Sequence, residues 1–156
     1  MAESRTSFDI GAALGELAQR FPGRVPQAQQ LLRFLGKPTD PSPPFLFVYG
    51  HEATGKTSVL KHLLKPSPES SPCHTYSSHL TAYVNCTECF TPRLIFETIL
   101  GQFCSAQPSF STGGLGPIKC DDIYDFSVQL AGQLRRDATR HTRYIVFDHA
   151  ERLRDM

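Results

Sequence analysis

The sequence lacks several features that would place the protein in a specialised class. It has no run of about 18 apolar residues, the length that a helix needs to cross a bilayer. Acidic residues at Glu3, Asp9 and Glu16 interrupt the N-terminal segment, which does not read as a signal peptide. We therefore expect a cytosolic or nuclear protein.

Charge of one sign is not in excess either. Lys and Arg number 16 and Asp and Glu number 15, which gives a net charge of +1. A protein that holds DNA alone is expected to carry a strongly basic footprint. If DNA is a partner, the contact is local or other subunits supply most of it.

Cysteine is sparse, and its five positions are Cys73, Cys86, Cys89, Cys104 and Cys120. An odd number in a reducing compartment argues against a disulfide framework. Cys86 and Cys89 have the C-x-x-C spacing of half a zinc site, but no second pair has suitable spacing. The motif also does not open a helix, as a thioredoxin-type redox site would. We predict core or surface thiols.

Three apolar runs predict strands. Residues 45–49 ("FLFVY"), 80–86 ("LTAYVNC") and 143–148 ("RYIVFD") are the runs, and the first and third are typical of strands buried on both faces. No internal repeat is visible. Because helical segments separate the runs, the order predicts an α/β fold with a parallel sheet and right-handed crossovers.

The helical segments carry recognisable ends. Pro26 suits a first helical position and Gly36 suits a helix end. Further helices are predicted over residues 8–20 and 57–64, from Thr91 as N-cap to about 103, and from Asp121 or Asp122 to about 140. The apolar stripe of the last helix is predicted to be Ile123, Phe126, Leu130 and Leu134. Residues 65–79 and 105–119 are rich in Ser, Pro and Gly and predict loops.

The stretch "GHEATGKT" matches the phosphate-loop pattern G-x-x-x-x-G-K-[ST]. Its glycines let the backbone approach phosphates, and its amides and the following helix N-terminus attract an anion. Lys56 would reach the β- and γ-phosphates, and Thr57 would offer its hydroxyl to Mg²⁺. An apolar run precedes the motif and a helical pattern follows it. The predicted ATP-binding residues are Gly50, His51, Glu52, Ala53, Thr54, Gly55, Lys56 and Thr57.

Asp148 ends the third apolar run and is the predicted second ligand for Mg²⁺. Many ATPases of this layout place Glu directly after that Asp, but His149 stands here. An arginine finger is worth about 10³–10⁵ in rate, and it would have to come from a partner or from further sequence. The residues therefore favour holding ATP over hydrolysing it, so we name no catalytic residue.

Three stretches together closely resemble the subunit 5 family of the eukaryotic origin recognition complex, in the initiator clade of the AAA+ ATPases. They are "VYGHEATGKT", "YVNCTECFTPRLIFETIL" and "YIVFDHAERLRDM". The resemblance implies an ATP-binding subunit of a nuclear complex that marks replication origins, with other complex subunits and origin DNA as partners. It makes Gly50 to Thr57 the Walker A site and Asp148 the Walker B residue. It also places Arg24 and Val25 beside the adenine, although an acidic residue commonly follows that arginine.

The resemblance implies an AAA+ P-loop domain, a three-layer sandwich with a parallel sheet of strand order 5-1-4-3-2. Residues 1–44 would be an N-terminal extension with the adenine-proximal box, and residues 45–156 the first part of the domain, truncated after Walker B. The fourth strand would lie between "FLFVY" and "YIVFD". Without it, the two runs either pair directly or leave the sheet incomplete. We thus expect a fragment that folds poorly and binds MgATP weakly, which a thermal melt followed by circular dichroism would test.

Three other interpretations stay open. The chain could be a non-functional or interfering fragment that does not bind ATP alone. It could be a small P-loop kinase, although no acceptor site or lid is evident. It could also be an interaction module that no longer binds nucleotide, which the intact sequence Gly55-Lys56-Thr57 argues against.

Overall fold

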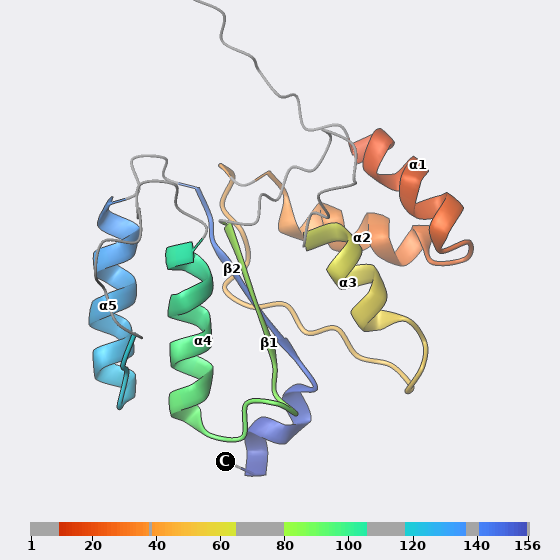
Figure 1. The fold of residues 1–156 in the computed structure, drawn as a ribbon. Coiled ribbons are helices and arrows are strands. Elements are labelled where there is room, and N and C mark those ends of the chain that lie inside the picture. Colours follow the sequence, from red (N-terminus) through yellow and green to blue (C-terminus); the bar gives the residue numbers. More distant parts are fainter. Residues whose placement is uncertain (1–9, 38, 65–79, 106–117, 137–140, 156) are drawn as a thin grey trace, which may run out of the picture. The chain divides into compact units, whose positions relative to one another are not determined.

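The computed structural model describes residues 10–37, 39–64, 80–105, 118–136 and 141–155 (Figure 1). The chain divides into two compact units, residues 1–77 and residues 78–156. Nearly all of the two predicted loops, 65–79 and 105–119, lies outside the described residues. In the described part of the chain, no helix is long and apolar enough to cross a membrane.

The first unit contains three helices in its described residues. Its helices are α1 (Ile10–Arg20), α2 (Val25–Leu35) and α3 (Lys56–Leu64). Helix α1 contacts both α2 and α3, and the buried side chains of Leu17, Leu32 and Leu63 come from these three helices. As predicted, α2 ends at Gly36, which takes a positive φ of 63° that suits glycine.

The apolar run at residues 45–49 does not form the predicted strand. Its residues lie outside helices and strands, and their side chains are exposed, with 80% of Phe45, 72% of Phe47 and 82% of Tyr49 accessible to solvent. A strand needs a hydrogen-bonded partner, and the sheet in the described residues contains two other segments.

The second unit contains the sheet. Strands β1 (Thr81–Asn85) and β2 (Tyr144–Asp148) run parallel, and Tyr83 is paired with Val146 in the register. Both strands and their parallel direction were predicted. Helix α4 (Pro92–Ser105) lies beside the sheet, and α5 (Ile123–Arg136) lies on the far side of α4 (Figure 1). A short 3-10 helix, η2 (Ala150–Asp155), follows β2.

One face of the sheet packs against α4. Ala82 and Val84 of β1 meet Ile95, Ile99 and Phe103 of α4 in the buried core. Strand residues two apart share a face, so Tyr83 and Asn85 lie on the opposite face. Asp148 pairs with Asn85 in the register and belongs to that same opposite face.

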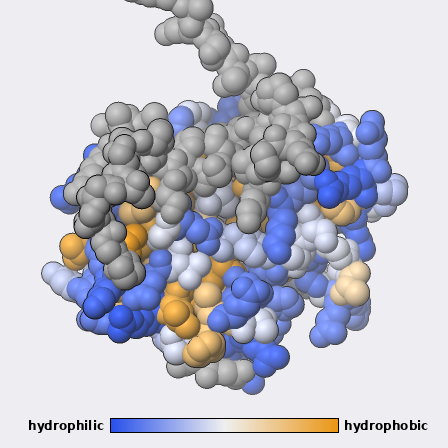
Figure 2. Space-filling view, in the orientation of Figure 1, coloured by the Kyte–Doolittle hydropathy of each residue, from blue (hydrophilic) through white to orange (hydrophobic). Residues whose placement is uncertain are grey.

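Helix α5 packs with only part of its predicted stripe. Phe126 and Leu130 are partly buried against the core, and the rings of Phe96 and Phe126 stack with centroids 4.8 Å apart. Ile123 and Leu134 are exposed, so the predicted stripe was wrong at both of its ends. Among the described helices, α5 makes its main contact with α4. In Figure 2, apolar residues gather in a patch low on the face in view, with hydrophilic residues beside it.

The predicted N-caps of the second unit are present. The Thr91 hydroxyl oxygen accepts a hydrogen bond from the Leu94 amide at 3.3 Å, at the start of α4. The Asp122 carboxylate accepts one from the Asp125 amide at 2.8 Å, at the start of α5. Of the two candidates for the second cap, the structure selects Asp122. Helix α5 is described to Arg136, and residues 137–140 lie outside the described residues.

Candidate nucleotide-binding site

The predicted phosphate loop leads directly into α3. Its backbone turns through residues with positive φ, namely Gly50 at 152°, Ala53 at 56° and Gly55 at 83°. The two glycines are suited to these angles because they have no Cβ, whereas Ala53 adopts a conformation that is uncommon for a side-chain-bearing residue. The loop is therefore tightly curved, as close backbone approach to a ligand requires.

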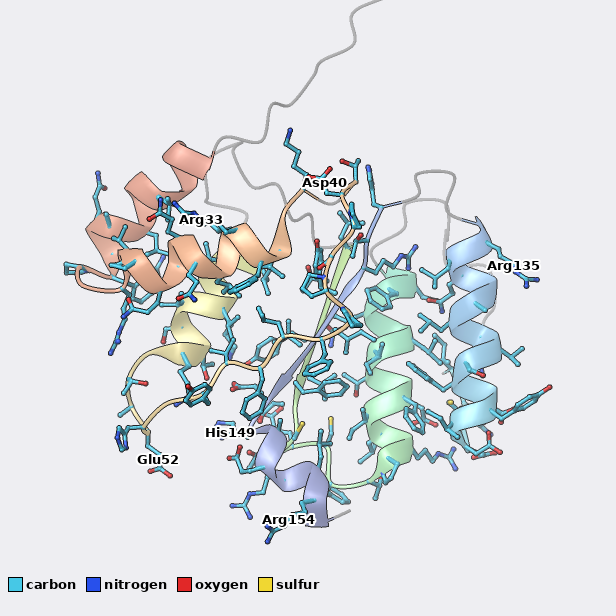
Figure 3. The ribbon with its side chains drawn as sticks, turned by 180° about the vertical axis from the view of Figure 1, so that it is seen from behind. Arg33, Asp40, Glu52, Arg135, His149 and Arg154 are labelled. Carbon is cyan, nitrogen blue, oxygen red and sulfur yellow. The ribbon has the colours of Figure 1, made fainter. Side chains whose placement is uncertain are left out.

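Lys56 lies across the loop that precedes it. Its ammonium group donates to the carbonyl oxygens of Gly50 and His51, both at 2.7 Å. The Thr54 hydroxyl also donates to the His51 carbonyl, at 2.8 Å. These bonds hold a positive charge over the curved backbone, where an anion would meet it. Figure 3 shows Glu52 on this loop.

The N-terminus of α3 adds a second attraction for anions. The first helical bond runs from the Val59 amide to the Gly55 carbonyl, at 3.0 Å. The amides of a helix's first turn have no carbonyl one turn earlier, and together they present about half a positive charge. Because Gly55 has no side chain, no side chain at this position can cap them. The loop, Lys56 and the helix end together make an arrangement that fits phosphate.

Arg24 and Val25 lie at the start of α2, in the same unit as the loop. Arg24 is the N-cap residue, with φ of −110°, and makes no capping bond through its side chain. Both side chains are half-buried. Their contact with adenine stays a prediction.

Asp148 ends β2 in the second unit. Its carboxylate Oδ2 accepts a hydrogen bond from the Tyr83 hydroxyl of the neighbouring strand. Its carbonyl accepts from the Cys86 amide at 2.9 Å, which extends the pairing of the two strands. Burial, and then the bond to Asp148, raise the pKa of Tyr83, so the phenol is a neutral donor at physiological pH. Thr57 belongs to the first unit, and its sharing of a metal with Asp148 stays a prediction.

His149 occupies the position where Glu follows the strand-end Asp in many ATPases (Figure 3). Its φ is 56°, and its Nδ1 lies 3.4 Å from a carboxylate oxygen of Glu151. Both side chains are exposed. Glu151 therefore pairs with His149, which gives that carboxylate a structural neighbour that the sequence did not reveal.

The contact between Tyr83 and Asp148 was missed from the sequence. The two residues are 65 positions apart, and no short motif links them. The signal available was the strand register, which places Tyr83 and Asp148 on one face. Gln102 was also missed: its side-chain amide accepts from the Tyr83 amide at 2.8 Å and donates to the Tyr83 carbonyl at 2.7 Å.

The four cysteines that the structure describes lie in the second unit. Cys86 and Cys120 are buried, and Cys89 and Cys104 are partly buried. Burial, and then the neighbouring Cys89, raise the pKa of the Cys86 thiol, which favours its protonated form. Cys73 lies outside the described residues.

Comparison with known protein families gives a match to the AAA ATPase domain over residues 20–156. The chain belongs to the AAA ATPase domain family. The match includes the phosphate loop and β2, and with the parallel strands it confirms the predicted α/β P-loop AAA+ fold, present here in part. Nucleotide binding is a general property of this family.

Two proteins that are similar to this chain in sequence have the same name. The chain is 29% identical over 145 residues to "Origin recognition complex subunit 5" of Drosophila melanogaster, covering 93% of this chain and 29% of that protein. It is 40% identical over 115 residues to the Homo sapiens protein of the same name, covering 72% and 24%. The chain thus spans less than a third of the length of these relatives. They confirm the resemblance to the subunit 5 family.

A solved structure agrees with the sequence comparison. A chain in "Structure of Drosophila ORC bound to DNA" matches with a TM-score of 0.71 and 30% identity, covering 93% of this chain and 34% of that chain. The similarity therefore extends to the three-dimensional arrangement as well as the sequence.

Proposed function

We propose that this chain is part of an ATP-binding subunit of the origin recognition complex. In this role it acts in the nucleus, with the other subunits of the complex and with origin DNA, in the initiation of DNA replication. Similarity in sequence to relatives of that name, and in structure to a chain of the Drosophila complex, supports this assignment. The observation that carries the nucleotide role is the Lys56 ammonium held over the phosphate loop.

The residues of the loop fit a nucleotide triphosphate. Lys56 would exchange its bonds to two carbonyls for bonds to phosphate oxygens, while the first turn of α3 donates its amides. Thr57 and Asp148 would supply the oxygen ligands that Mg²⁺ prefers. When bound, Mg²⁺ would neutralise phosphate charge.

We propose further that ATP is held between neighbouring AAA+ subunits as a structural ligand and is not turned over. His149 stands where Glu would polarise water, and the nearby Glu151 is paired with it at 3.4 Å. A ligand at 100 times its dissociation constant stabilises the bound state by about 2.7 kcal/mol, enough to favour assembly strongly.

The test is assembly of this chain with the other complex subunits, with and without ATP. We expect assembly to weaken without ATP and, by at least about tenfold, in Lys56→Ala, because the lost charged hydrogen bonds are each worth about 1.5–3 kcal/mol. Lys61→Ala is the matched control, since Lys61 is an exposed lysine on the same helix. Equal assembly under every condition would instead favour a pure interaction module.

Turnover is tested separately by phosphate release from the purified chain. We expect release at the background level of the Lys56→Ala variant. Release well above that level, lost in Lys56→Ala, would contradict the structural-ligand role while leaving nucleotide binding intact.

A further inference from the structure

We propose that Tyr83 is a positioning residue for Asp148: its hydroxyl restricts the orientation of the carboxylate that, under the proposed function, is a ligand of Mg²⁺. This inference rests on the proposed nucleotide-binding function and adds a residue to it. It begins from the hydrogen bond that Tyr83 donates to Asp148 Oδ2 within the second unit.

The strand register makes this contact a consequence of the fold. Tyr83 is opposite Val146, and Asn85 is opposite Asp148, so the Tyr83 and Asp148 side chains emerge on one face, about two residues apart along the strands. A tyrosine is long enough to span that offset, and its hydroxyl reaches the carboxylate at the strand end. This face is the one opposite α4.

The backbone of Tyr83 is itself fixed by a side chain of α4. The Gln102 side chain on α4 bonds both the amide and the carbonyl of Tyr83, at 2.8 and 2.7 Å. Helix α4 is anchored through Ile99 and Phe103 in the core. A continuous path of contacts therefore runs from the core through Gln102 and Tyr83 to the carboxylate of Asp148.

On the other side, the backbone of Asp148 is fixed by the 2.9 Å bond from the Cys86 amide to its carbonyl. With the backbone fixed, the remaining freedom of Asp148 is rotation of its side chain. A bond from Tyr83 to one carboxylate oxygen restricts that rotation and so sets the direction of the other oxygen. Such partners of metal-binding carboxylates change metal affinity by about 10–100-fold when they are removed.

The experiment measures how the Mg²⁺ concentration controls binding of a fluorescent ATP analogue to the full chain. Tyr83→Phe removes the hydroxyl and keeps the ring. We expect the Mg²⁺ concentration for half-maximal binding to rise about tenfold or more, while binding of the metal-free analogue in EDTA stays at the wild-type level. Tyr124→Phe is the matched control, because Tyr124 is an exposed tyrosine on α5 of the same unit.

A double variant tests whether the effect passes through Asp148. Asp148→Asn should itself raise the Mg²⁺ requirement, and adding Tyr83→Phe to it should cause no further rise, because the hydroxyl then has no carboxylate to direct. An independent rise of the same size in the Asp148→Asn background would overturn the proposal.

The remaining outcomes separate this inference from the function it rests on. If the wild-type chain binds the analogue and Tyr83→Phe shows an unchanged Mg²⁺ requirement, the positioning role is overturned and nucleotide binding stands. If Tyr83→Phe weakens binding equally with and without Mg²⁺, the residue is merely structural and the positioning role again fails. If the wild-type chain does not bind the analogue at any Mg²⁺ concentration, the nucleotide-binding function fails, and the positioning role fails with it.

Discussion

Two apolar runs, one of five residues and one of four that ends at Asp148, lead to the two halves of the predicted site, and the structure places them differently. Residues 45–49 lead to the phosphate loop and are exposed, whereas Tyr144–Asp148 form β2 and pair with β1. Both runs are rich in β-branched and aromatic residues, which favour strands. The difference teaches that a partner strand, and not the composition of the run, decides whether such a run becomes part of a sheet.

The largest predicted effect on stability is the difference between replacing a buried phenylalanine and replacing an exposed one. Phe103 is 1% exposed in the core of the second unit, and Phe47 is 72% exposed in the apolar run. We expect Phe103→Ala to lower the free energy of unfolding by about 3–5 kcal/mol. We expect Phe47→Ala to change it by less than about 0.5 kcal/mol.

Urea denaturation followed by circular dichroism measures both variants. Equal losses would break the comparison, because they would mean that residues 45–49 are packed in solution as tightly as the core. A small loss for Phe103→Ala would instead question the core of the second unit.

A smaller effect on stability should follow from removing the Gln102 side chain, which hydrogen-bonds the edge of β1 that faces away from β2. Gln102→Ala removes two part-buried hydrogen bonds to the Tyr83 amide and carbonyl, and each such bond is worth about 0.5–1.5 kcal/mol. Hydrogen exchange at the Tyr83 amide should also accelerate. Gln129→Ala is a control. The Gln129 side-chain amide donates a hydrogen bond to the carbonyl of Lys119, and Lys119 does not lie in a strand. Unchanged exchange at Tyr83 would show that the Gln102 contact does not persist in solution.

The smallest effect concerns how two helices begin. Thr91 caps α4 with its hydroxyl, while α3 follows Gly55, which has no side chain. We expect Thr91→Ala to lower the free energy of unfolding by about 1 kcal/mol, and Thr91→Ser to restore most of it. Thermal denaturation of the two variants measures this. A Thr91→Ser variant as unstable as Thr91→Ala would argue against the cap.

The sequence was most informative where the determinants are local. Thr91, Asp122 and Gly36 act within three or four residues of their own position, and the helix ends predicted from them are present. The phosphate loop is likewise local, since its curvature depends on Gly50 and Gly55. Such features need no knowledge of the rest of the fold.

The sequence was least informative where distant segments meet. The Tyr83–Asp148 contact depends on the register of two strands, and the Gln102 contact depends on how α4 packs on β1. The exposure of Ile123 and Leu134 depends on how many neighbours α5 has, which a helical stripe does not encode. Residues 45–49 have the composition of a strand, but composition carries no information on whether a partner is available.

The Gln102 amide has a consequence for how the sheet can be extended. A side-chain amide has the same donor and acceptor as a peptide group, so at Tyr83 it imitates a single residue of an adjacent strand. A strand that approached β1 would have to displace two hydrogen bonds before forming its own, which makes this border of the sheet a barrier to edge-to-edge aggregation. One glutamine side chain on α4 therefore does at Tyr83 what a charged or bulged edge strand does in other sheets.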